Sequence, residues 1–215
     1  MRQLLTGGCG TLMTKMLSCL LRKCAIFLTS PSDFAPLPQE KDRAFIIFRE
    51  VIDISFAQAN LLQRGILIRG GMTVGPLFYD SSHVFGPGLV RAYELESRLA
   101  IYPRIVTEMY FDRYFPEYTK GEFPFVETDF DGIPYLSYLS PNTFASAVGM
   151  TLNALKQAHT SITLNLQDTR SEVGADRQKQ LWLVRKFNEL ANQLNKPGFL
   201  IDPTQHFAPP KEAKE

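Results

Sequence analysis

Polar residues that could do chemistry are concentrated between residues 69 and 94, among tight turns and short apolar segments. Arg69 directly follows the apolar run 66–68. A guanidinium in such a position must find a carboxylate or reach solvent, so Arg69 is either an anchor beside a binding site or the partner of an acidic side chain. His83 precedes a Gly-Pro-Gly turn, and a neutral imidazole can hydrogen-bond the edge of a pyrimidine base. The alternative is a loop histidine without a role.

The turn Gly86-Pro87-Gly88 precedes a predicted helix over residues 89–100. Backbone amides at such a helix start can bind an anion, although a simple turn explains the same residues. Within the helix, Arg91 could contact a phosphate or lie on a solvated charged face. Tyr93 lies about 160° around the helix axis from Arg91, so the two cannot both face one pocket well. Core packing is the favoured role for Tyr93, and nucleotide contact is the alternative.

The elements that must position these residues alternate between strands and helices, which predicts an α/β domain. A helix over 39–63 precedes the polar stretch, and an apolar segment at 66–68 predicts a central strand. The predicted apolar face of the helix comprises Phe45, Phe48, Ile52, Phe56, Ala59 and Leu62. The other elements predicted up to residue 115 are a helix at 11–22, strands at 24–29, 72–79, 83–85 and 103–106, a loop at 30–38 and a short helix at 108–115.

The second half of the chain predicts a hairpin and two helices. Strands at 123–128 and 133–139 flank Phe130-Asp131-Gly132, a strong turn signal. Asp129 and Asp131 resemble a metal-binding pair, but the turn explains both. Helices are predicted at 143–163 and 176–194. The second has an apolar stripe of Leu181, Val184, Phe187 and Leu190, and beside it Trp182 is predicted to be a core residue.

Composition excludes several classes of protein. The 215 residues suffice for one domain, and a net charge of +1 gives no global field for nucleic acid or acidic lipid. The three cysteines (Cys9, Cys19 and Cys24) lie close together near the N-terminus and form no disulfide framework, which favours a reduced, cytoplasmic setting. No apolar run approaches the ~20 residues that a membrane span requires. We therefore expect neither a nucleic-acid partner nor a membrane.

Five blocks of sequence resemble a known family. They are RGGMTVG (69–75), VFGPGLVRAYELES (84–97), YPRIV (102–106), TDFDGIPYLSYL (128–139) and DRQKQLWLVRKFNE (176–189). Together they resemble the class III nucleotidyl cyclase catalytic domain, and are closest to the uridylate and cytidylate cyclases of the Pycsar anti-phage system. The resemblance implies an α/β (α+β) fold: a ferredoxin-like core with a mixed, mostly antiparallel sheet and a helical C-terminal extension.

The resemblance also implies a function. Such enzymes form head-to-tail homodimers and use two Mn²⁺ or Mg²⁺ ions to convert a nucleoside triphosphate into a 3′,5′-cyclic nucleotide and diphosphate. UTP is the expected substrate, and cyclic UMP the expected second messenger in anti-phage defence. Arg91 is then the catalytic candidate, and His83, Gly86, Tyr93 and Arg69 are the nucleotide-binding candidates.

The chain departs from the family at the metal ligands. The family's two metal-binding aspartates are not identifiable here, because residues 1–23 contain no acid and Cys24 stands at the second aspartate position. Two positions on the helix that the family fills with Asn and Arg are Val90 and Glu94. A coding sequence that is truncated or wrongly started upstream of about Cys24 is the favoured explanation. The alternative is an inactive pseudocyclase that binds nucleotide or dimerises.

The resemblance gives a division of the chain into four parts. Residues 1–23 are an atypical N-terminal segment, and 24–125 are a cyclase-like core without its first strand and helix. Residues 126–201 are a hairpin and helical extension of the same domain, and 202–215 are a flexible tail.

Overall fold

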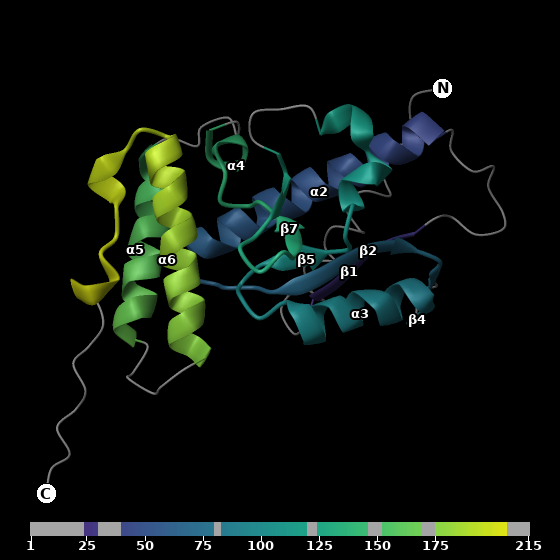
Figure 1. The fold of residues 1–215 in the computed structure, drawn as a ribbon, viewed down its shortest axis with the longest axis horizontal. Coiled ribbons are helices and arrows are strands. Elements are labelled where there is room, and N and C mark those ends of the chain that lie inside the picture. The colour runs from purple at the N-terminus through teal and green to yellow at the C-terminus, as the bar shows by residue number, and fades with distance from the viewer. Residues whose placement is uncertain are drawn as a thin grey trace, which may run out of the picture.

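The computed structural model describes residues 24–29, 40–79, 83–119, 124–145, 152–168 and 175–205. These residues form an α+β fold in which helices surround one mixed sheet (Figure 1). The five sheet strands are β1 (Cys24–Thr29), β2 (Gly70–Gly75), β5 (Ile105–Thr107), β6 (Val126–Thr128) and β7 (Pro134–Leu136). The helices are α2 (Glu40–Gln63), α3 (Pro87–Leu99), α4 (Pro141–Ala145), α5 (Leu152–Asp168) and α6 (Ala175–Gln193).

The strand order in the sheet is β1-β2-β5-β7-β6. β1, β2 and β5 run parallel, and β7 and β6 continue the sheet in antiparallel pairings. The expectation of a mostly antiparallel sheet is therefore wrong, because the parallel pairings join six and three residue pairs whereas the antiparallel pairings join one and three. Long helical connections after β1 and β2 allow the parallel arrangement. A separate short ladder pairs β3 (Phe78–Tyr79) with β4 (Val84–Phe85).

Helices cover both faces of the sheet: α2 lies on one side and α3 on the other (Figure 1). Side chains alternate along β2, so Met72 joins the core cluster that contains the α2 residue Val51, whereas Gly71 faces α3. A methyl group added at Gly71 would lie 2.2 Å from the carbonyl oxygen of Ala92 in α3. Glycine is therefore required where α3 approaches the β2 backbone.

Helix α2 ends where the sequence predicts, but its buried face differs from the prediction. Gly65 has φ +76°, and the Ile66 N–H donates to the Leu61 carbonyl at 3.0 Å, which closes the helix with a Schellman-type cap. Ala59 and Leu62 are buried as predicted, whereas Phe45 is 50% exposed. The apolar residues that are buried between residues 44 and 54 of α2 are Ala44, Ile47, Val51 and Ile54.

Several other boundaries differ from the prediction. Residues 66–68 form no strand, since pairing in the sheet starts at Gly70. The predicted short helix at 108–115 is two 3-10 turns, η1 (Phe111–Tyr114) and η2 (Pro116–Tyr118), and further turns η3 (Pro197–Phe199) and η4 (Pro203–Gln205) follow α6. The predicted hairpin is confirmed as β6 and β7. The predicted helix at 11–22, the loop at 30–38 and residues 206–215 of the predicted tail lie outside the described residues.

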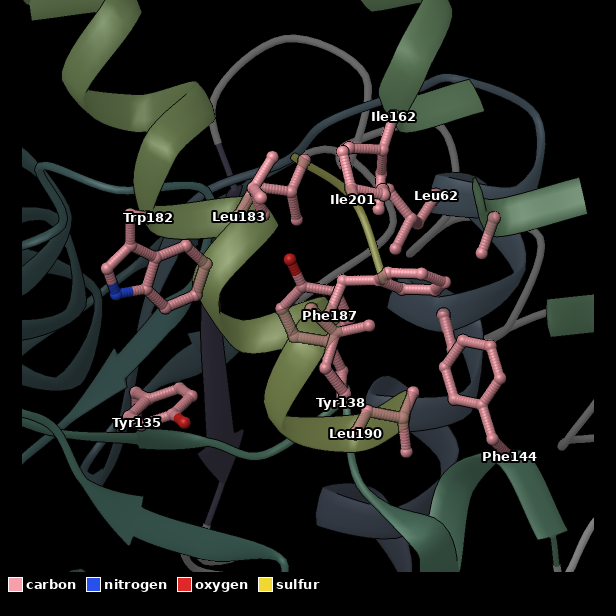
Figure 2. Close-up of a cluster of buried hydrophobic side chains, with 14 of the residues drawn as sticks. Leu62, Tyr135, Tyr138, Phe144, Ile162, Trp182, Leu183, Phe187, Leu190 and Ile201 are labelled. Carbon is pink, nitrogen blue, oxygen red and sulfur yellow. The ribbon is translucent and has the colours of Figure 1, made fainter. Parts of the chain in front are cut away.

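A large apolar core joins the α5–α6 pair to α2 and the sheet. Figure 2 shows Phe187 of α6 gathered with Leu62 of α2, Ile162 of α5 and Tyr138. Of the predicted α6 stripe, Val184, Phe187 and Leu190 are buried, whereas Leu181 is exposed. Trp182 is buried as predicted.

Among the residues that the structure describes, no helix combines the length and apolarity needed to cross a membrane.

Candidate functional site

The carboxyl ends of the parallel strands bring several predicted site residues to one end of the sheet. β2 ends at Gly75, beside the start of α3, and β5 ends at Thr107. His83 and Gly86 lie on the connection from β2 to α3, and Arg91 lies on the second turn of α3. Ligands of open α/β sheets commonly bind at the carboxyl ends of the strands. This end is therefore the candidate functional site.

Arg91 contacts two carboxylates, of which Glu108 joins α3 to the end of β5 and Glu94 lies on α3 itself. Its Nε donates to Glu108 Oε1 at 2.9 Å, and its Nη1 donates to Glu94 Oε2 at 3.2 Å. The hydrogen bond to Glu108, then that to Glu94, raises the pKa of Arg91 above its ordinary value. Because Arg91 is exposed, each pair contributes little to stability. These contacts use two of the five guanidinium N–H donors, so a phosphate bound to the remaining donors would lie close to both carboxylates.

The Gly86-Pro87-Gly88 turn packs tightly against the end of β2. Gly86 has φ +145°, and a methyl group there would lie 2.7 Å from the Pro76 carbonyl oxygen. The Gly88 N–H donates to that same oxygen at 3.0 Å, and Pro87 has no N–H. The amides of Pro87 and Gly88 are thus not offered to an anion. The turn explanation accounts for these glycines better than the anion-binding one.

His83 and Tyr93 are both exposed. His83 immediately precedes β4, as its predicted place beside the turn requires. Tyr93 is 55% exposed, so the prediction that it packs in the core is wrong. The buried positions of α3 are Gly88, Ala92, Leu95 and Glu96, and Tyr93 lies away from them on the helix surface.

Arg69 lies at the opposite end of the sheet from Arg91. It directly precedes β2, and its Nη1 donates to the Ala100 carbonyl at 3.2 Å, just past the end of α3. Its Nη2 is 2.8 Å from Oε1 of the buried Glu96. Arg69 therefore holds the C-terminal end of α3 against the sheet, which is the structural alternative predicted for it, and it is not brought together with Arg91.

Arg104 is fully buried, and the sequence pattern predicts no role for it. Its guanidinium forms ion pairs with Asp129 and Asp131 in the β6–β7 turn. Asp129 also accepts hydrogen bonds from Trp182 Nε1 at 2.5 Å and from Arg185 Nη2 at 3.0 Å. We call these five residues the Arg104 cluster. The cluster attaches α6 to the sheet. The two aspartates of the Asp-x-Asp sequence therefore belong to the hairpin turn and form ion pairs with Arg104.

The charge on Asp129 is stabilised by its neighbours. Burial opposes its ionisation, but hydrogen bonds from the Trp182 indole and the Phe130 amide, and the charges of Lys186 and Arg104, together lower the pKa of Asp129 below its ordinary value. The Arg104 guanidinium also lies 5.1 Å from the centre of the Tyr102 ring. The Arg104 cluster is a charged, hydrogen-bonded core element.

The described residues do not fit the pair of metal ions that the resemblance implies. Nowhere in the described ranges do three His, Cys, Asp or Glu side chains gather so that they could hold an ion. The two carboxylates at the candidate site, Glu94 and Glu108, are both paired with Arg91. These two carboxylates are therefore engaged by a guanidinium and not arranged as a pair of metal ligands.

Sequence reasoning missed Glu108 and Arg104. The sequence pattern predicts only that Glu108 lies in a short helix. Its contact with Arg91 spans seventeen residues, and helical periodicity cannot predict a contact over that separation. Arg104 had a usable signal: a charge next to the apolar pair Ile105-Val106, followed by two aspartates in a predicted turn.

Comparisons of the chain with protein-family models, with curated proteins and with solved structures found no match.

Proposed function

We propose that this chain is a nucleotidyl cyclase-type domain that binds UTP at the carboxyl ends of β2 and β5. In the proposed reaction the ribose 3′-hydroxyl attacks the α-phosphorus, the ring closes as cyclic UMP, and diphosphate leaves. The product would serve as a second messenger in anti-phage defence. The ferredoxin-like cyclase core and the head-to-tail homodimer belong to the same proposal.

One observation supports the location of the site. His83 and Gly86 lie on the connection from β2 to α3, Arg91 lies on the second turn of α3, and all three are at the end of the sheet where α/β folds bind ligands. Arg91 offers a planar fork of donors that suits phosphate oxygens. The exposed imidazole of His83 can donate to or accept from a pyrimidine edge. The five sequence blocks support the reaction itself.

A second candidate function is nucleotide binding without turnover. It is favoured by the two carboxylates that hold Arg91, since Glu94 and Glu108 would repel a triphosphate unless they moved or were neutralised. A domain of this kind would bind nucleotide weakly, without dependence on a metal ion, and would still dimerise.

One set of measurements tests the proposal and separates it from the second candidate. The purified protein is incubated with each of the four ribonucleoside triphosphates and Mn²⁺ or Mg²⁺, and cyclic products are identified by mass spectrometry. Binding is measured in parallel by calorimetry, and self-association by sedimentation. Cyclic UMP that accumulates with time supports the cyclase, whereas binding without product supports the second candidate.

The matched variants are Arg91→Ala and Arg98→Ala, which remove the same charge from two exposed positions of α3. We expect weaker nucleotide binding and loss of product in Arg91→Ala only. Equal behaviour of the two variants would show that the site lies elsewhere. Failure of the unaltered protein to bind any of the four triphosphates would refute both candidate functions.

A further inference from the structure

Tyr110 has a backbone conformation that tyrosine rarely adopts. Its φ of 59° and ψ of 32° lie in the left-handed region, in a turn closed by the Phe111 N–H donating to the Glu108 carbonyl at 3.2 Å. At the third position of a four-residue turn, positive φ is usually met by glycine or asparagine, because a Cβ crowds the neighbouring carbonyl. A glycine at residue 110 would adopt this conformation more easily.

The core explains the turn but not the tyrosine. Val106 and Thr107 are buried before the turn, and Phe111 and Phe115 are buried after it. The chain must therefore reverse sharply between β5 and Phe111 so that both sides stay buried. The side chain of Tyr110, in contrast, is 71% exposed, so the fold gains little from it. A strained and exposed aromatic residue indicates a function for the side chain.

The turn lies at the candidate site. It follows the carboxyl end of β5 directly, and its first residue, Glu108, holds the guanidinium of Arg91 at 2.9 Å. Tyr110 is two residues further along the same turn. An aromatic ring is thus presented at the end of the sheet where Arg91 would contact phosphate, and the backbone of the turn is fixed by the buried residues on either side.

We infer that Tyr110 stacks on the base of the nucleotide bound at this end of the sheet, and this inference rests on the proposed function. Every base has a planar face on which an aromatic ring can stack, and such stacking needs no fixed hydrogen-bond pattern. Tyr110 therefore contributes affinity for all four bases, whereas discrimination between bases is left to hydrogen-bonding side chains at this end of the sheet, such as His83. The fixed turn reduces the entropy lost on binding.

The test compares three substitutions at this one position in the full-length chain. Tyr110→Phe keeps the ring, Tyr110→Ala removes it and keeps a Cβ, and Tyr110→Gly removes it and relieves the backbone. Calorimetry with UTP measures affinity, thermal melting measures stability, and sedimentation measures self-association. Phe130→Ala, at the exposed tip of the β6–β7 hairpin, is the matched loss of an exposed aromatic side chain.

We expect Tyr110→Ala and Tyr110→Gly to weaken UTP binding about tenfold, which corresponds to about 1.4 kcal/mol. Tyr110→Phe and Phe130→Ala should bind like the unaltered protein, and Tyr110→Gly should melt at or above its temperature. If the unaltered protein binds UTP and Tyr110→Ala binds it equally well, the role of Tyr110 is overturned while the proposed function stands. A change in sedimentation without a change in affinity would overturn it as well, and absence of UTP binding by the unaltered protein would overturn the proposed function with it.

Discussion

Replacing Asp129 by asparagine should destabilise the protein by removing the negative charge at the centre of the Arg104 cluster. Asp129 is buried and accepts hydrogen bonds from Arg104, Trp182 and Arg185. Asparagine keeps the shape but offers a single acceptor oxygen and an N–H₂ group that faces donors. The fully buried guanidinium of Arg104 then keeps only Asp131 as a carboxylate partner.

The size of the effect follows from burial. Breaking a buried ion pair by removing one partner typically costs about 3–5 kcal/mol, because the other charge stays in the interior. Asp131 remains on Arg104, so we expect the lower end, about 3 kcal/mol. With a urea dependence of about 2 kcal/mol per molar for a chain of this size, the midpoint of unfolding should fall by about 1.5 M.

Urea unfolding followed by circular dichroism and by fluorescence measures this loss. The chain's only tryptophan, Trp182, donates to Asp129, so fluorescence reports on the cluster directly. Asp53→Asn is the control, because Asp53 pairs with Arg49 at 3.8 Å on the exposed side of α2, and its loss should change stability by less than about 0.5 kcal/mol. A loss below about 1 kcal/mol for Asp129→Asn would refute the assigned role of the cluster.

Three further predictions follow from other features. Gly71→Ala should lower the free energy of unfolding by about 3 kcal/mol, because the new methyl group meets the α3 backbone at the Ala92 carbonyl. Gly65→Ala should lower it by only about 1 kcal/mol, because the methyl group meets no atom within 4 Å and only the φ of +76° is unfavourable. Thermal melting measures both losses. Because the pKa of Asp129 is lowered on folding, its ionised carboxylate stabilises the protein fully above the unfolded-state pKa near 3.8, and this stabilisation is lost as pH falls through the lower folded-state pKa. Asp129→Asn should therefore flatten the acid limb of a curve of unfolding free energy against pH. An unchanged acid limb would contradict this. Arg91→Ala should change the free energy of unfolding by less than about 1 kcal/mol while weakening UTP binding about tenfold, and a large stability loss would show that Arg91 is structural.

Local signals predicted most of the elements. The Asp131-Gly132 turn located the hairpin, because Gly132 supplies the φ of +77° that the turn needs. Gly65 located the end of α2 for the same reason. These predictions succeeded because the cause of each boundary lies within a few residues of it.

Predictions that depended on distant partners succeeded less often. In α2 the large aromatic residues suggested a face through Phe45 and Phe48, but the smaller residues Ala44 and Ile47 are the buried ones. Phe48 lies at the edge of that face, where its ring stacks on the Tyr118 ring with 4.5 Å between the ring centres. Periodicity identifies an apolar helix, but the neighbours that pack against it decide which of two adjacent stripes is buried.

The two arginines beside strands show the same limit for the candidate site. Arg69 and Arg104 both adjoin apolar residues, yet only Arg104 is fully buried. Its carboxylate partners lie twenty-five and twenty-seven residues away, so the signal that separates it from Arg69 is a distant one, the two aspartates in a predicted turn. Likewise, Arg91 on α3 contacts Glu108 after β5 because β5 pairs with β2, and a local pattern does not predict this strand order.

The glycine contacts between β2 and α3 also have a mechanical consequence. At Gly71 the helix lies directly on the strand, and a Cβ added at Gly75 would lie 3.2 Å from the Cα of Gly88. Because no side chain that could change rotamer lies between them at Gly71, we expect the strand and the helix to move together. Arg91 is thus carried by a rigid strand–helix unit and faces a fixed turn, so accommodation of a ligand at this end must come from rotamer changes of the Arg91 and Glu108 side chains.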